Sequence, residues 1–412
     1  MGFKNLMQSL TRRTFIKTAT GTGAALSAAE TAISEASPTL IQRRPDLLGK
    51  KGKTYPDQRR KYTDSKSGRT VWQLTDTPGF TTQTLYWTNQ HSRDSRWMPY
   101  ASGIYQGESG GRQRWRYNLF NMDLRTGESV QLTDSGNVVA HSPDLSRDGK
   151  TLYYFEAPRT FRSVNLGTLE DREICKLEDK ALVTHALSVN ASNRWAVVAA
   201  ELNEPQGGYR YARYSQHMVL ALIDVNDGSL VYLINGNTSL GHVAFSPANP
   251  NLVLYSYHGQ WWEIQRPWLI NADGTGSRPI FLAHNGEAVG HEFWSDNGEH
   301  VYVSCFGGRQ PQGLWRTDLS GNEECVLAGS SVAHNAVNAE EDRFVVDELY
   351  HETTALWTSR KGSTEPEILC QLAADWWVGP ERAGRDHPHS RFLPNSQGLT
   401  FSSAGEIYLV EI

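Results

Sequence analysis

The sequence is poor in clustered cysteine, in surplus positive charge and in long hydrophobic runs, and each shortage excludes a class of protein. Its four cysteines, Cys175, Cys305, Cys325 and Cys370, are too scattered for a zinc knuckle or a redox pair, so we expect core thiols. Forty lysines and arginines against 45 acidic residues give a formal charge of -5. Nucleic acid is therefore not an expected partner, because a phosphate backbone is bound by a basic surplus.

What the chain does contain favours β-structure. Its 36 glycines, 13 tryptophans and 17 tyrosines suit many turns and many half-buried flat surfaces. No stretch keeps a 3.6-residue apolar period between two helix caps, so we predict little helix.

The N-terminus carries a targeting pattern. Arg12-Arg13 precede Thr14-Phe15-Ile16-Lys17, and a mild Gly/Ala/Thr-rich run follows to about Ile33. This resembles a twin-arginine export signal. We predict a signal over 1–36, a linker over 37–54 and a folded domain over 55–412, with the export machinery as a partner and a periplasmic or secreted location. The apolar run is too short for a lasting membrane span once the signal is removed.

A repeat of about fifty residues organises the rest of the chain. In six of the seven copies a histidine stands ten or eleven residues ahead of an apolar strand, and Trp87 takes that place in the first copy. The histidines are His141, His185, His242, His291, His334 and His389.

Strand-turn-strand units lie between these phrases. They cover 117–132, 219–233 and 314–327, two of them with an Asx-Gly or Thr-Gly turn, and such units are typical of hairpins. Four short strands in each of seven units predict an all-β fold, a seven-bladed β-propeller. We expect 71–74 to pair with 406–410 and close the ring. An irregular β-sandwich would not explain the even spacing.

The repeated histidines predict a site on the propeller axis, because equivalent positions of the innermost strands converge there. His387-Pro388-His389 adds an i, i+2 pair, which points to one face of an extended strand. With His291 from the next-but-one blade, the pair offers three imidazoles to a divalent ion such as Mn²⁺, Fe²⁺, Ni²⁺ or Zn²⁺.

A second candidate lies in the tract 209–214, where aromatic and basic residues alternate. Arg210 and Arg213 could bind carboxylates while the neighbouring tyrosines stack on sugar rings. An exposed loop with no such role is the alternative.

Several segments resemble those of the oligogalacturonate lyases, a family of seven-bladed, pectin-degrading propellers that are also similar to TolB-like proteins. The segments are Gly241-His242, Trp268 to Gly274, Gly290-His291-Glu292-Phe293-Trp294 and His387-Pro388-His389. The resemblance runs from about Tyr55 to the C-terminus. It implies Mn²⁺ as cofactor, held by His291, His387 and His389, and His242 as the catalytic histidine.

Two family positions are altered in this chain. The fourth metal ligand of the family, a glutamine, falls on Gly384, so that water, substrate or Asp386 would have to complete the shell. The family's partner arginine falls on Val219, for which Arg210 or Arg213 could substitute.

The resemblance implies that an acidic oligosaccharide is the substrate and that short oligogalacturonides are cleaved by β-elimination to 4,5-unsaturated uronates. His242 would remove the C5 proton, which a metal bound to the adjacent carboxylate makes more acidic. His185, His334 and Arg266 would contact the substrate. Two alternatives stay open: a non-enzymatic periplasmic propeller that binds a glycan or protein, and a lyase or epimerase for another uronate.

Overall fold

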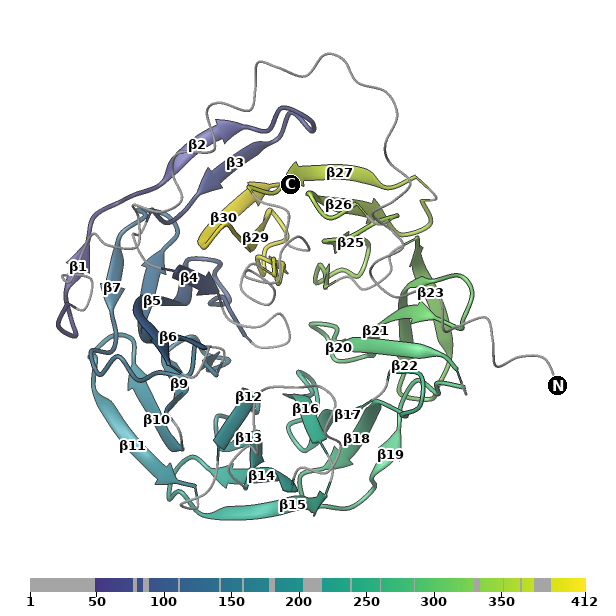
Figure 1. Ribbon diagram of the computed structural model, residues 1–412, viewed down its shortest axis with the longest axis horizontal. Coiled ribbons are helices and arrows are strands. Elements are labelled where there is room, and N and C mark those ends of the chain that lie inside the picture. The colour runs from purple at the N-terminus through teal and green to yellow at the C-terminus, as the bar shows by residue number, and fades with distance from the viewer. Residues whose placement is uncertain are drawn as a thin grey trace. The chain divides into compact units, whose positions relative to one another are not determined.

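The computed structural model describes residues 49–412 except 77–79, 84–88, 110–111, 141, 158, 178–181, 203–216, 238, 260, 285, 330–333, 351, 364 and 374–386. Every helix or strand element in these residues is a β-strand, and the strands form seven antiparallel sheets arranged in a ring (Figure 1). The seven-bladed propeller predicted from the sequence is confirmed. A search of the same residues for a helix long and apolar enough to cross a membrane finds none.

Each sheet is one blade, and its strands follow from the axis outward. Blade 1 contains β4 (Phe80–Gln83), β5 (Trp97–Ser109), β6 (Arg112–Asp123), β7 (Ser129–Gln131) and β1 (Thr54–Tyr55). Blade 2 contains β8 (Asp144–Leu145), β9 (Thr151–Glu156), β10 (Thr160–Asn165) and β11 (Asp171–Lys176). Blade 3 contains β12 (Leu182–Val189), β13 (Trp195–Glu201), β14 (His217–Asp224) and β15 (Leu230–Asn237).

The other four blades repeat this plan. Blade 4 contains β16 (Ser239–Phe245), β17 (Leu252–His258), β18 (Pro267–Asn271) and β19 (Arg278–Pro279). Blade 5 contains β20 (Ala288–Trp294), β21 (His300–Gly307), β22 (Gly313–Asp318) and β23 (Glu323–Ala328). Blade 6 contains β24 (Asn335–Val337), β25 (Arg343–Val346), β26 (Ala355–Arg360) and β27 (Glu367–Gln371). Blade 7 contains β28 (Arg391–Phe392), β29 (Gly398–Ser403), β30 (Glu406–Glu411), β3 (Thr70–Gln73) and β2 (Arg60–Thr63).

The apolar cores lie between neighbouring blades. One core joins the side chains of blade 2 to those of blade 3, and another joins blade 4 to blade 5. The alternation of each strand supplies them, since every second side chain faces one neighbour and the others face the next. All four cysteines are free; Cys305 is buried in the core between blades 4 and 5, and Cys370 in the core between blades 6 and 7.

The ring closes through a sheet built from both ends of the domain. In blade 7, β3 pairs antiparallel with β30, so that Val71 lies opposite Val410, and the Trp72 Nε1–H donates to Glu411 at 2.8 Å. The predicted pairing of 71–74 with 406–410 is thereby confirmed. The N-terminal strands also bridge two blades, because β1 pairs with β7 of blade 1.

The predicted export signal over 1–36 lies outside the described residues, as does most of the predicted linker over 37–54. Its described part, from residue 49, contacts blade 1: the Gly52 N–H donates to the Gln131 carbonyl at 2.8 Å.

The tight packing where β30 closes the ring predicts that a substitution there lowers the stability of the fold. Val410 is fully buried between β3 and β29, whereas Val231 on β15 is 56% exposed. Because Val410→Ala removes buried apolar atoms and leaves a void, we expect it to lower the free energy of unfolding by about 2 kcal/mol. The same change at Val231 should cost about 0.5 kcal/mol or less. Denaturant unfolding of the two variants measures the difference, and equal midpoints would contradict tight packing at the closure.

Candidate active site

The histidines of blades 4, 5 and 7 lie at irregular points of the backbone. The register of β16 against β17 shifts between Gly241 and Ala244, and that of β20 against β21 shifts between Gly290 and Phe293. His242, His291 and His389 all have positive φ, at 47°, 55° and 43°. A bulge re-aims one side chain, and bulges are over-represented next to active sites. The repeat therefore turns the histidine away from the regular alternation of its strand.

The residue before His291 must be small. A Cβ on Gly290 would lie 2.0 Å from the ring of Trp261, so only glycine lets this half-buried indole pack against the strand. The indole also lies edge-on to His291, with ring centroids 5.7 Å apart. Gly290 thus allows an aromatic wall beside the histidine.

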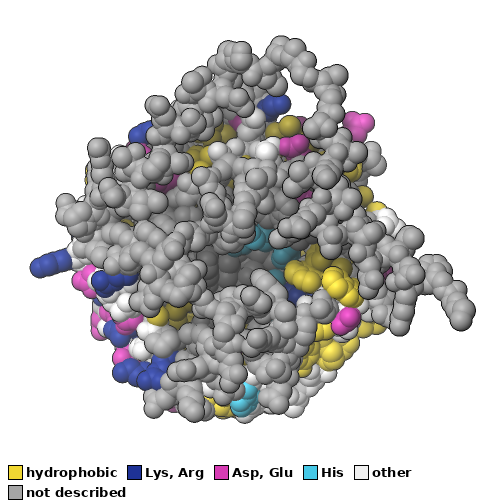
Figure 2. Space-filling model, in the orientation of Figure 1, with side chains coloured by type: hydrophobic (Ala, Val, Ile, Leu, Met, Phe, Trp, Pro, Cys, Tyr) yellow, Lys and Arg dark blue, Asp and Glu magenta, His cyan; other side chains and the backbone are white. Residues whose placement is uncertain are grey.

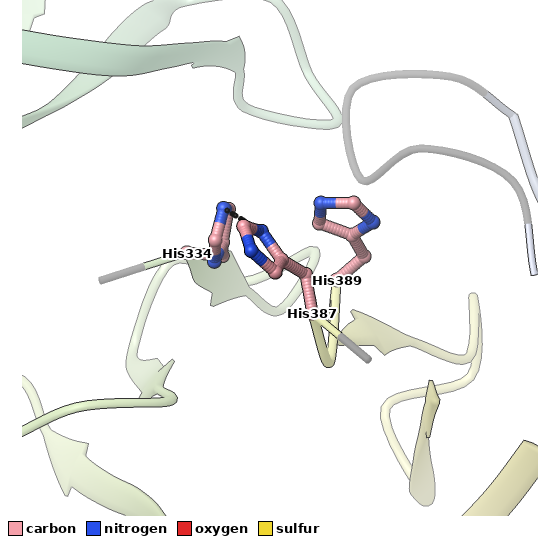
Figure 3. Close-up of side chains that lie close together, drawn as sticks. All are labelled: His334, His387 and His389. Atoms are coloured by element: carbon pink, nitrogen blue, oxygen red, sulfur yellow. Dashed lines mark hydrogen bonds between the residues drawn. The ribbon is translucent and has the colours of Figure 1, made fainter. Parts of the chain in front are cut away.

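Three histidines from two blades form a cluster suited to a metal ion. The ligand nitrogens of His334, His387 and His389 all lie within 4.8 Å of one another, and His387 Nδ1 is 3.1 Å from His334 Nε2 (Figure 3). The ring of His291 lies beside this cluster, with its centroid 4.4 Å from that of His334. Histidine side chains are visible in the hollow at the centre of one face of the molecule (Figure 2).

His334 is held in place by a buried aspartate. Its Nδ1 lies 2.8 Å from Asp347 Oδ2, and its backbone N–H donates to Asp347 Oδ1 at 2.8 Å. A carboxyl group at Nδ1 directs Nε2 toward the other imidazoles, the arrangement commonly found behind metal-binding histidines. Burial, and then the neighbouring imidazoles, hold the pKa of His334 well below its usual value. The ring is therefore neutral near pH 7, as a metal ligand must be.

His242 belongs to a second buried network at the same end of the central channel. Its Nδ1 lies 2.7 Å from Glu292 Oε2, and the Arg266 Nε–H donates to Glu292 Oε1 at 2.9 Å. Burial would raise the pKa of the fully buried Glu292, but Arg266 and His242 hold it well below its usual value. Burial lowers the pKa of His242, and the bond to Glu292 only partly opposes this. A neutral His242 that donates from Nδ1 to a carboxylate presents Nε2 as a proton acceptor.

The network of His242 lies next to the histidine cluster. The rings of His242 and His291 are nearly parallel, with centroids 6.3 Å apart, and the Arg266 guanidinium lies 4.3 Å from the centroid of Trp261. A proton acceptor, a cluster of metal-type donors and an aromatic surface are thus brought together by blades 4 to 7.

The structure tests several of the sequence-based candidates only in part. It brings His242, His291, His334, His387 and His389 to one mouth. His185 is a residue of β12, the inner strand of blade 3. Arg210, Arg213, Gly384 and Asp386 lie outside the described residues, and their predicted roles stay predictions. Val219 is 1% exposed in the core of blade 3, so this position provides no polar group to a substrate.

Two residues have contacts that the sequence did not predict. Arg266, predicted to hold a substrate carboxylate, is 3% exposed and already pairs with Glu292. His334, predicted as a substrate contact, has its Nε2 among the metal-type donors. The sequence reasoning missed Glu292, Asp347 and Trp261. Glu292 follows His291 in the recognised segment, whereas no sequence signal marks Asp347 or Trp261.

The buried pair of Glu292 and Arg266 predicts that a small chemical change greatly lowers the free energy of unfolding. Glu292→Gln leaves Arg266 charged and unpaired inside the protein, and we expect it to lower the free energy of unfolding by about 3–5 kcal/mol. Glu367 offers a matched control, because it pairs with Arg69 at the same 2.9 Å but is 65% exposed. Glu367→Gln should cost about 1 kcal/mol or less. Similar losses for the two variants in denaturant unfolding would contradict the buried network.

Comparison with known proteins identifies relatives of this chain. The family model described as oligogalacturonate lyase matches residues 49–328. The oligogalacturonate lyase of Dickeya dadantii (strain 3937) is 27% identical over 379 residues, which cover 86% of this chain and 95% of that protein.

Solved structures show the same fold. An oligogalacturonate lyase in complex with manganese superposes with a TM-score of 0.78 at 21% identity, covering 88% of this chain and 98% of its own. An oligogalacturonate lyase from Vibrio parahaemolyticus gives 0.76 at 22% identity, covering the same shares. The resemblance seen in the sequence is confirmed, and the chain belongs to the oligogalacturonate lyase family.

Proposed function

We propose that this protein cleaves short oligogalacturonides by β-elimination and leaves a 4,5-unsaturated uronate at the new end. Its family is one of lyases, and its relative from Dickeya dadantii is an oligogalacturonate lyase. The observation that carries the proposal is the buried His242–Glu292–Arg266 network beside the histidine cluster. Together they supply a proton acceptor and a cation site, the two groups that β-elimination of a uronate requires.

A divalent ion, Mn²⁺ by analogy with the solved relative, fits the donor set. His291, His387 and His389 stay our proposed ligands, and we add His334, whose Nε2 lies 3.1 Å from His387 Nδ1. His334 would supply a further donor, because the position of the family's glutamine ligand reads Gly384 in this sequence. When bound, the ion neutralises the substrate carboxylate and so makes the C5 proton more acidic.

His242 is the proposed general base. Glu292 accepts the hydrogen bond from Nδ1 and fixes the orientation of the ring, and Nε2 removes the C5 proton. Elimination then breaks the bond between C4 and its glycosidic oxygen. Arg266 acts as a positioning residue through Glu292, since its guanidinium is buried and occupied by that carboxylate.

The remaining parts of the proposal concern substrate contacts and location. His185, Arg210 and Arg213 are proposed to bind the acidic sugar chain, together with the half-buried face of Trp261. The Arg12-Arg13 pattern supports transport by the twin-arginine machinery to the periplasm or the exterior. One observation favours a non-catalytic glycan-binding propeller instead: Val219, where the family has an arginine, is buried in the core.

Removal of the proposed base separates these two functions. His242→Ala should lower the rate of unsaturated-product formation at least about 10²-fold, because general base catalysis contributes that much. Oligogalacturonate turnover by the Mn²⁺-loaded protein is followed by the ultraviolet absorbance of the unsaturated product. His284→Ala, at an exposed histidine of the segment between blades 4 and 5, is the control and should retain the wild-type rate. A wild-type protein that binds the oligomers without forming this product would favour the binding function.

The aspartate behind His334 provides a test of the metal site that does not depend on turnover. Asp347→Asn weakens the orienting bond to Nδ1, so we expect Mn²⁺ affinity to fall by about 10- to 100-fold. Calorimetric titration with Mn²⁺ measures it. Asp273→Asn, at an exposed turn of blade 4, is the matched control. Unchanged affinity in Asp347→Asn would remove His334 from the ligand set.

A further inference from the structure

A group of arginines surrounds the axis beyond the histidines. Two adjoining cavities, of about 470 and 490 Å³ with open solvent included, have several lining residues in common. These are Asn89, Arg147, Asp296 and Arg391, and Arg93 lines the second cavity as well.

These cavities lie at a different level of the channel from the proposed metal site. Phe245, Trp294 and Phe392 contribute to their walls, and each stands three residues after a site histidine, namely His242, His291 and His389. Phe245, Trp294 and Phe392 each pair with the next strand beyond the irregular segment that carries the histidine. The arginine group therefore forms a separate site farther along the inner strands.

The charges around the cavities are not balanced. The Arg391 guanidinium pairs with Asp296 at 3.0 Å and so joins blade 7 to blade 5. Arg147 is half-buried, yet its guanidinium makes no ion pair or hydrogen bond within the described part of the chain. Burial, followed by repulsion from Arg93, lowers the pKa of Arg147.

The other nearby carboxyl group, that of Asp144, compensates Arg147 only in part. The two side-chain oxygens of Asp144 accept the backbone N–H groups of Asn89 and Val189, at 2.8 and 2.7 Å. Burial raises the pKa of Asp144 to about 7, so that much of it is uncharged near neutral pH. Asp296 is thus the one carboxylate among the cavity-lining residues that faces the three guanidiniums.

We propose that these cavities bind an oxyanion, a carboxylate or a phosphate, with Arg147 as its main partner and Arg93 and Arg391 beside it. A planar guanidinium offers a carboxylate or phosphate two parallel hydrogen bonds, and in a partly buried cavity these are strong. Two sources fit this chemistry: the carboxylate of a uronic acid and free phosphate. The site goes beyond the proposed lyase reaction and does not depend on it.

Direct binding measurements test the site. The full-length protein, freed of excess metal, is titrated by calorimetry with galacturonate, with phosphate and with uncharged galactose. Arg147→Gln should weaken binding of the oxyanion at least tenfold. Arg343→Gln, at a half-buried arginine of β25 that lines neither cavity, should leave it unchanged. Because the histidine cluster is intact in both variants, the difference reports the arginine site.

The outcomes decide the proposal whether or not the chain has lyase activity. Tenfold weaker binding in Arg147→Gln alone supports it, and the tighter of galacturonate and phosphate identifies the source. Equal binding by wild type and Arg147→Gln, equal loss in Arg343→Gln, or galactose bound as tightly as galacturonate would overturn it. If Arg147→Gln does not fold, Arg93→Gln at the exposed rim replaces it, with at least threefold weaker binding expected.

Discussion

The site depends on one geometric constraint, the convergence of inner strands on a common axis. No blade holds the proposed chemistry alone: His242 comes from blade 4, His291 from blade 5, His334 from blade 6 and the His387/His389 pair from blade 7. The bulges at Gly241 and Gly290 then turn single side chains out of the regular pleat. Convergence brings the histidines together, and the backbone irregularity aims them.

Burial has different consequences for the His242 network and for the group of arginines. Glu292 keeps its charge because Arg266 supports it, and that charge in turn orients His242. Arg147 has no such partner among the residues that the structure describes, so its charge is available to a ligand. The same inner strands thus carry a charge-balanced network at one level and an unbalanced group of arginines at another.

The sequence predicted the blades and the histidines better than the groups that hold them. The repeat of histidine before an apolar strand determined the blade number, and the pairing of Val71 with the last strand followed from the need to close the ring. Asp347 could not be predicted, because thirteen residues separate it from His334 and its position follows only from the β24–β25 pairing. Arg266 was assigned to the substrate because a sequence cannot show that Glu292 lies within reach of it.

The sheet shared by the two ends of the domain has a consequence for biosynthesis. Strand β3 leaves the ribosome early, but its partner β30 is translated last, so blade 7 is assembled only when the whole domain has emerged. A prematurely terminated chain lacks that partner and leaves the edge of β3 unpaired, and such an edge is prone to aggregation. Completion of translation is thereby a condition for the native ring.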